Sequence, residues 1–323
     1  MRAILLVKTS SLGDVIHNLP VVSDLRRIWP KVAIDWVVEE NFASLPRLHP
    51  EVRRVIPVAV RRWRKQLGQK ATWAEMRAFR RELQRDYYDL IIDTQGLIKS
   101  GLITWLAQGL RCGYSAEVAR ERLAAWAYDC SYLIPPNAHA VERNRWLAAA
   151  AAQYTLDLPL RYGIQAPAEA PAWLPAEPCC VLLTATSRDD KLWPEAHWIA
   201  LGAQLHAAGL RSVLPAGSPR ERERATRIAT AIPNAIVAPP CDLDTLAAVF
   251  GVARATVGVD TGLTHLAAAL NRPVVALYVA TDPGLTGVHA GPRAINLGGI
   301  GQLPEPGAVM HHLQSLMAET PPR

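Results

Sequence analysis

The sequence predicts an α/β protein made of two lobes, each built on an open parallel sheet. In both halves of the chain, short apolar runs typical of buried strands end in polar turns and lead into helix-like segments. Residues 157–180 carry five prolines among alanines and are the best candidate for a linker between the halves. We expect a ligand to bind in a central cleft, outside the carboxyl ends of the strands.

Individual elements follow from the spacing of apolar residues. In the first half we expect strands at 3–7, 33–38, 52–58 and 90–93, and helices at 15–29, 71–85, 97–110, 117–128 and 138–154. In the second half we expect strands at 180–183, 212–215, 235–237, 255–259 and 273–278, and helices at 194–208, 220–232, 242–250 and 306–317. These elements place one lobe at residues 1–160 and the other at 161–323, with a last helix that can cross back to the first lobe.

The composition argues against a membrane-spanning protein, a secreted protein and a protein stabilised by a metal. The 323 residues are 50% apolar and 20% charged, which is enough to build a sizeable core. No run approaches the roughly 18 apolar residues of a membrane helix, and the first residues do not form a signal peptide. The five cysteines lack metal-ligand spacing and are interpreted as buried free thiols. We therefore expect a cytoplasmic protein without a structural metal.

Charge is distributed unevenly between the halves. Residues 1–165 hold 24 Lys or Arg against 16 Asp or Glu, a net charge of +8, whereas residues 166–323 have a net charge of −2. The first half therefore favours an anionic partner: a nucleic acid, an anionic lipid surface, or a phosphorylated or carboxylated substrate. For most of these arginines, a solvated surface position remains the simpler interpretation.

A basic loop and a basic helix follow one another in the first half. Residues 61–65 pack four cations around Trp63, and the helix at 71–85 has arginines at positions 77, 81 and 85. Such a helix can lie on an anionic membrane, or it can be a domain helix whose charged side faces water. We favour the second interpretation for the helix and take the loop as the better functional candidate.

The segment VGVDTGLTHLAAAL, residues 257–270, has the form of an anion site. A strand-like run stops at Asp260, Thr261 and Gly262, and a helix-like run begins at once. The unpaired first amides of a helix and its dipole attract negative charge, and glycine lets a ligand approach the backbone closely. His265, one turn further on, either reaches the ligand or packs in the core. An ordinary capped helix explains this segment almost equally well.

Two further charged side chains occupy turns after predicted strands. Asp14 follows the first strand and begins a helix, so it is either a capping carboxylate or a general base. Lys191 lies in the turn before Trp193 and Pro194, where it either meets a diphosphate or remains exposed. No dinucleotide-binding glycine motif follows the first strand, and no P-loop sequence is present.

Five motifs in order resemble those of a known family. They are KTSSLGDVIHNLP (8–20), DTQGLIKS (93–100), HAVERNR (139–145), TSRDDKLWP (186–194) and VGVDTGLTHLAAAL (257–270). Together they resemble the lipopolysaccharide heptosyltransferase I family over almost the whole chain, and TDPGLTG (281–287) is also similar. Each motif is weak alone, but five in the same order are specific.

The resemblance implies a fold and a reaction. The fold would be the GT-B architecture: an N-terminal acceptor lobe and a C-terminal donor lobe, both Rossmann-like. The reaction would be an inverting transfer of L-glycero-D-manno-heptose from ADP-heptose to the Kdo of Kdo2-lipid A, without a metal or other cofactor. The enzyme would be peripheral on the cytoplasmic face of the inner membrane, with the anionic inner leaflet and not nucleic acid as its surface partner.

The resemblance also implies roles for individual residues. Asp14 would be the base, and Lys191 would stabilise the leaving diphosphate. The donor would contact Thr186, Ser187, Lys191, Glu221, Asp260, Thr261, Gly262 and His265. The acceptor would contact Lys8, Ser10, Gly13, Arg61, Arg62, Lys99, Arg120, His139 and Arg143.

Two departures from the family pattern are visible. Ala216 stands where the family commonly has tryptophan before the glycine of the LPxG turn, and Ser187 replaces a frequent threonine while keeping the hydroxyl. The alternatives are heptosyltransferase II or another GT-B nucleotide-sugar transferase. From a different class, the alternative is a non-catalytic binder of anionic lipid or nucleic acid, which would leave the donor-lobe motifs without a purpose.

Overall fold

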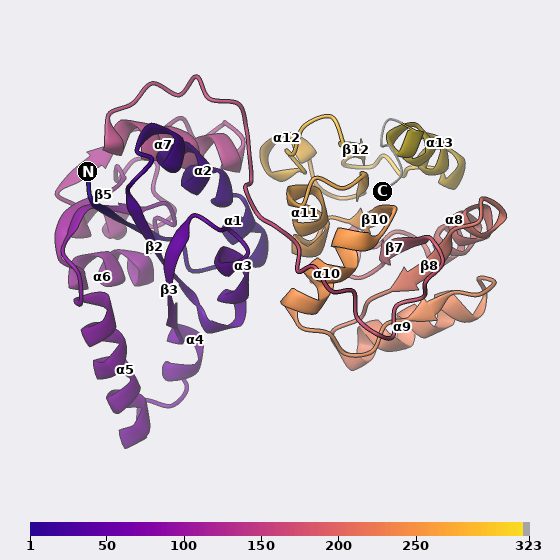
Figure 1. Ribbon diagram of the computed structural model, residues 1–323, viewed down its shortest axis with the longest axis horizontal. Coiled ribbons are helices and arrows are strands. Elements are labelled where there is room, and N and C mark those ends of the chain that lie inside the picture. The colour runs from indigo at the N-terminus through magenta and orange to yellow at the C-terminus, as the bar shows by residue number, and fades with distance from the viewer. Residues whose placement is uncertain (319–323) are drawn as a thin grey trace. The chain divides into compact units, whose positions relative to one another are not determined.

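The computed structural model describes residues 1–318, and the chain divides into two compact α/β units. The first unit is Met1–Ile164 and the second is Gln165–Arg323, so the division falls inside the proline-rich segment. Each unit has its own six-stranded parallel sheet, and helices cover both faces of each sheet (Figure 1). The α/β class with two parallel sheets, predicted from the alternating pattern, is confirmed.

The first unit has strand order β3-β2-β1-β4-β5-β6. Its strands are β1 (Ala3–Val7), β2 (Ala33–Glu39), β3 (Val52–Val58), β4 (Tyr88–Asp93), β5 (Gly109–Tyr114) and β6 (Cys130–Tyr132). Its helices are α1 (Leu12–Ile16), α2 (Leu19–Ile28), η1 (Glu40–Phe42), α3 (Ser44–Arg47), α4 (Val60–Trp63), α5 (Lys70–Leu83), α6 (Ile98–Leu106), η2 (Arg122–Ala127) and α7 (Ala140–Ala152). The chain order reverses between β1 and β4, and this switch point is where such sheets bind ligands.

The second unit repeats this topology, with strand order β12-β11-β10-β7-β8-β9. Its strands are β7 (Cys179–Leu183), β8 (Arg211–Leu214), β9 (Ile236–Val237), β10 (Ala255–Val259), β11 (Val274–Tyr278) and β12 (Ala294–Gly298). Its helices are η3 (Asp189–Lys191), α8 (Glu195–Ala207), α9 (Pro219–Thr230), α10 (Leu243–Val252), α11 (Gly262–Ala269), α12 (Pro283–Thr286) and α13 (Pro306–Ala318). Its switch point lies between β7 and β10.

Central strands are apolar on both faces because helices bury both sides of each sheet. All five residues of β1, β7, β10 and β11 are buried. In the second unit this core also takes in α13, whose Val309, Leu313 and Leu316 pack with the apolar side chains of α8. The last helix therefore packs in the core of the second unit.

Two segments of the first unit differ from the sequence prediction. Residues 117–128 were expected to form one helix, but they form turns followed by the short 3-10 helix η2. The expected helix at 97–110 ends at Leu106 because Gly109 begins strand β5. At Gly109 a side chain would lie 2.0 Å from the carbonyl oxygen of Tyr88, so only glycine permits this strand pairing.

Helix α5, expected to be either a membrane-surface helix or a domain helix, is a domain helix. Its Phe79 and Leu83 are buried in the core of the first unit beside Trp63. Its arginines at positions 77, 80 and 81 are exposed. Within residues 1–318, no helix has both the length and the apolar composition needed to cross a bilayer.

Candidate functional site

Polar side chains gather at the switch point of the first unit. Lys8 directly follows β1, and Thr94 and Gln95 directly follow β4, so the parallel register brings these turns together. The Lys8 Nζ donates to the Thr94 carbonyl oxygen at 2.7 Å, and Gln95 Oε1 accepts from the backbone amides of Thr9 and Ser10. These contacts fix the loop that presents Asp14.

Asp14 lies in the first turn of α1 and is bound by a guanidinium. Arg120 Nη2 donates to Asp14 Oδ1 at 2.7 Å, and its Nη1 donates to Oδ2 at 3.2 Å. The Ser11 amide and hydroxyl also donate to Oδ2, which closes a capping box. Asp14 is therefore both a helix cap and a carboxylate paired with a cation.

The charges around Asp14 shift the ionisation of this cluster. Burial raises the pKa of the Asp14 carboxyl, but Lys8 and Arg120 outweigh burial and hold that pKa well below its usual range. Burial also lowers the pKa of the Lys8 ammonium to about 8, although Asp14 opposes this change. At neutral pH Asp14 is thus ionised, and Lys8 is mostly charged while buried.

A small cavity lies beside this pair. Its volume is about 20 Å³, room for one water molecule, and Asp14, Arg120 and Arg143 are among its lining residues. Arg143 extends over the ring of Tyr114 at 5.2 Å and donates to the Val118 carbonyl oxygen. Lys8, Arg120 and Arg143 therefore converge on this small cavity.

The other residues predicted to bind the acceptor are divided between this cluster and its surroundings. Lys99 Nζ donates to Ser10 Oγ at 2.7 Å, which places both near Asp14 in the same loop system. Gly13 precedes Asp14 in α1. His139 caps α7 by accepting from the Val141 amide, and its ring meets that of His17.

The two predicted acceptor residues of the basic loop, Arg61 and Arg62, differ in their surroundings. Arg61 is exposed and its guanidinium lies 5.7 Å from the centre of the Phe42 ring. Arg62 instead forms ion pairs with Glu40 at 3.0 Å and Glu75 at 2.8 Å. This bridging role ties α4 to neighbouring elements and makes Arg62 a weaker candidate for binding the acceptor.

The second switch point contains an ion pair between two of the predicted donor residues. Lys191 Nζ lies 2.7 Å from Asp260 Oδ2, and the Thr281 hydroxyl donates to the same oxygen. The Thr186 hydroxyl donates to the Asp260 carbonyl oxygen at 2.9 Å. The loops after β7 and β10 are therefore joined through Asp260, next to the first amides of α11.

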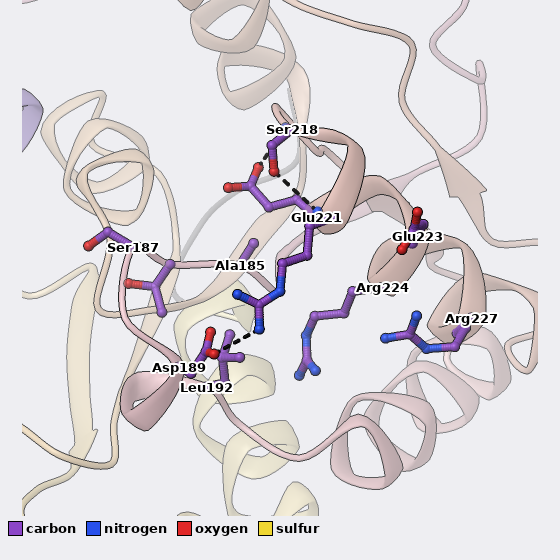
Figure 2. A pocket seen from close by; sticks show the side chains of 11 residues that line it. Ala185, Ser187, Asp189, Leu192, Ser218, Glu221, Glu223, Arg224 and Arg227 are labelled. Carbon is purple, nitrogen blue, oxygen red and sulfur yellow. Dashed lines mark hydrogen bonds and ion pairs between the residues drawn. The ribbon is translucent and has the colours of Figure 1, made fainter.

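Two adjoining hollows lie beside these loops, and Thr186, Ser187 and Glu221 line both of them. One has a volume of about 400 Å³ and extends along α9, where Figure 2 shows Arg224 and Arg227 on the helix and Ser187 and Asp189 on the opposite loop. The other, about 300 Å³, is bounded by Ala216, Thr261 and apolar side chains. Their combined size and mixed polarity suit a nucleotide.

Residues that cap helices α9 and α11 lie beside these hollows. Glu221 Oε2 accepts from the Gly217 and Ser218 amides, so this predicted donor-binding residue is also the capping-box residue of α9. Thr261 is the N-cap of α11 without a side-chain cap bond, whereas Thr264 donates to the Val259 carbonyl oxygen. His265 lies in α11 and is buried.

Sequence reasoning missed several residues at these sites. Asn144 accepts from Lys8 Nζ and from the Tyr114 hydroxyl, and it lies in the same motif as Arg143. Arg224 binds the backbone of Trp193 and pairs with Glu195, fixing the loop that carries Lys191. The arginines at 220, 224 and 227 recur at helical spacing, a signal that could have identified this face of α9.

Comparison with known proteins agrees with this geometry. The chain is 46% identical to lipopolysaccharide heptosyltransferase 1 of Escherichia coli (strain K12), over 88% of this chain and 90% of that protein. It is 25% identical to E. coli lipopolysaccharide heptosyltransferase 2, over 88% of this chain and 84% of that protein. The first of these relatives is much the nearer.

Solved structures with similar folds carry nucleotide ligands. The E. coli heptosyltransferase WaaC with ADP matches with a TM-score of 0.89 and 41% identity, covering 97% of this chain and 99% of that one. The same enzyme with ADP-2-deoxy-2-fluoro heptose matches with a TM-score of 0.85 and 40% identity, with the same coverage. The fold is therefore the GT-B architecture of these enzymes.

The sequence profile of glycosyltransferase family 9 (heptosyltransferase) matches residues 76–310, which include most of both switch-point sites. This match and the relative at 46% identity lead to one conclusion. The chain is a glycosyltransferase and belongs to glycosyltransferase family 9, the heptosyltransferases.

Proposed function

We propose that this enzyme transfers L-glycero-D-manno-heptose from ADP-heptose to the Kdo of Kdo2-lipid A, a step in building the lipopolysaccharide inner core. The observation that carries the proposal is the likeness to a heptosyltransferase bound to an ADP-heptose analogue, at 40% identity over 97% of this chain. The roles of the two units follow from their chemistry: the cationic first unit receives the acceptor, and the second unit receives the donor.

The proposed chemistry is a single displacement with inversion at the anomeric carbon. Asp14 takes the proton from the attacking Kdo hydroxyl as the new carbon–oxygen bond forms, and the bond to ADP breaks. A carboxylate suits this role because it is ionised at neutral pH and stands at the carboxyl edge of the sheet. Such general base catalysis contributes roughly 10²–10⁴-fold to rate.

Donor binding is proposed for the loops after β7 and β10. The adenosine occupies the hollows lined by Thr186, Ser187 and Glu221. The diphosphate lies by Lys191 and the first amides of α11, which begins at Gly262. These groups stabilise the charge that develops on departing ADP, so we propose that the reaction needs no added metal.

Acceptor binding is proposed for the cations around Asp14. Arg120, Arg143 and Lys99 converge on this part of the first unit, and Arg61 stands exposed nearby on α4. Kdo carboxylates and lipid A phosphates are anions that guanidinium groups bind in bidentate fashion. An acceptor of this kind places the enzyme on the cytoplasmic face of the inner membrane.

One experiment tests the proposal and separates it from the nearest alternative. The purified enzyme is given radiolabelled ADP-heptose with either Kdo2-lipid A or an acceptor that already carries the first heptose, with and without EDTA. We expect transfer to Kdo2-lipid A alone and no loss of rate with EDTA. Transfer only to the heptosylated acceptor would support heptosyltransferase II. Transfer to neither acceptor, with transfer from a UDP- or GDP-sugar offered in a parallel reaction, would support another nucleotide-sugar transferase.

A further inference from the structure

An exposed apolar face lies on two neighbouring elements of the first unit, α6 and η2. On α6, Ile98, Leu102 and Trp105 follow one another at helical spacing and are 49%, 56% and 58% exposed. On η2, Leu123 and Trp126 are 55% and 85% exposed and are three residues apart, which is one turn of a 3-10 helix. We call these five side chains the α6–η2 face.

The two elements form one surface because they pack closely. A Cβ placed on Gly101 of α6 would lie 3.1 Å from the carbonyl oxygen of Ala124 and 3.3 Å from Ala127 Cβ. Small residues therefore occupy the contact between α6 and η2, while the large apolar residues point away from it. Exposed tryptophans with aliphatic neighbours are typical of proteins that insert side chains into a membrane interface.

This face adjoins the cationic cluster at Asp14. Lys99 is next to Ile98 in α6 and donates to Ser10 Oγ, while Arg120 precedes Leu123 by three residues and pairs with Asp14. The Glu121 amide donates to the Gly96 carbonyl oxygen, so the turn before η2 is bound to the turn before α6. A molecule with an anionic head at Lys99 and Arg120 would thus have its apolar part beside the α6–η2 face.

We propose that the α6–η2 face docks on the anionic lipid bilayer that presents the acceptor. This inference rests on the proposed function and identifies which surface meets the membrane. Apolar side chains enter the interface, and the first unit, with a net charge of +8 over residues 1–165, is attracted to anionic headgroups. Helix α5, for which the sequence left open a membrane-surface position, buries its Phe79 and Leu83 in the core of the first unit.

The test uses the whole protein and vesicles of phosphatidylethanolamine with phosphatidylglycerol. The double variant Trp105→Ser, Trp126→Ser should lose vesicle association by about tenfold or more, because burial of two indoles is removed. Trp73→Ser is the matched control, since Trp73 is 48% exposed on α5, and it should bind like the wild type. Circular dichroism and thermal unfolding report whether the variants keep their fold.

A second measurement uses a conservative variant and does not depend on the serine variant folding. Brominated phospholipids should quench part of the tryptophan fluorescence of the wild type. The variant Trp105→Phe, Trp126→Phe should still bind the vesicles but lose that quenching. Binding by the serine variant equal to the wild type, or quenching unchanged in the phenylalanine variant, would overturn the proposal.

Activity separates this inference from the proposed function. On an O-deacylated, water-soluble acceptor, the serine variant should keep the wild-type kcat/KM, whereas on acceptor embedded in vesicles its KM should rise. If the wild type fails on both acceptors, the proposed function is wrong, while the vesicle assay still decides the docking face. A wild-type dimer that the serine substitutions dissociate would instead assign the face to a second copy of this chain.

Discussion

Arg120 holds both carboxylate oxygens of Asp14, with nitrogen–oxygen distances of 2.7 and 3.2 Å. A bidentate guanidinium stabilises the ionised carboxylate and makes it a weaker base. The proposed acceptor is itself an anion that can compete for Arg120. Binding of the acceptor would therefore draw Arg120 away from Asp14, enlarge the small cavity beside it and restore basicity where the proton must be taken.

The first prediction concerns Arg120→Met. Losing the guanidinium removes one cause of the low pKa of Asp14, so the pKa rises. Because the base must be ionised, the acid limb of the kcat/KM profile should move to higher pH. The acceptor KM should rise about 10–100-fold, the effect of losing one charge-assisted hydrogen bond, while the donor KM stays unchanged.

To test this prediction, kcat/KM of the wild type and of Arg120→Met is measured with a soluble acceptor from acidic to neutral pH. Arg122→Met is the matched control because Arg122 is an exposed arginine two residues away. It should leave the acid limb in place. An acid limb that does not move in Arg120→Met would show that Asp14 is not the titrating base.

The second prediction concerns Lys8. Burial lowers its pKa to about 8, so the ammonium loses its charge as pH rises through that value. The neutral amine no longer stabilises ionised Asp14 or an anionic acceptor, and kcat/KM should fall with a midpoint of about 8. Lys8→Arg keeps the charge at every accessible pH and should remove this basic limb. Persistence of the limb in Lys8→Arg would assign it to another group.

The third prediction concerns Lys191→Met. Lys191 Nζ is 2.7 Å from Asp260 at the start of α11, where we propose the diphosphate lies. Loss of one charged hydrogen bond should weaken ADP binding by about 10–100-fold, measured by calorimetry. Arg188→Met is the control, because that cation lies in the same loop and is largely exposed. Equal ADP affinity in Lys191→Met and the wild type would remove Lys191 from the donor site.

Local patterns in the sequence predicted the buried strands and the turns that carry both sites. Apolar runs such as β1 and β10 are continuous, and glycine or capping residues mark the helices that follow. Strands β5, β6 and β12 were missed because they are short or only partly buried, so their apolar signal is weak. Local periodicity cannot reveal such strands, whose pairing partners lie far away in the chain.

Contacts between residues far apart in the chain could not be predicted from local sequence patterns. Asp14 and Arg120 were both predicted as site residues, but nothing local shows that two residues 106 positions apart form an ion pair. Arg62 was predicted as a ligand from its basic neighbours, and its pairing with Glu40 and Glu75 depends on how α4 and α5 pack. The exposure of Ile98, Leu102 and Trp105 on α6 likewise depends on how the unit folds, and the spacing of apolar residues in the sequence did not indicate it.

The last prediction tests a buried ion pair that lies in a family motif but outside the proposed chemistry. Arg145 Nε donates to Asp24 Oδ2 at 2.7 Å, and both side chains are almost fully buried between α7 and α2. Asp24→Ala removes the buried carboxylate that pairs with the guanidinium, which keeps only Glu142 at 3.4 Å and the Leu158 carbonyl oxygen at 2.7 Å. The loss should lower the free energy of unfolding of the first unit by about 3–5 kcal/mol. Asp129→Ala, which breaks a partly exposed pair with Arg111, should cost less, about 0–1 kcal/mol for the pair itself. Urea unfolding followed by circular dichroism and fluorescence measures both, and similar losses in the two variants would contradict the role of burial.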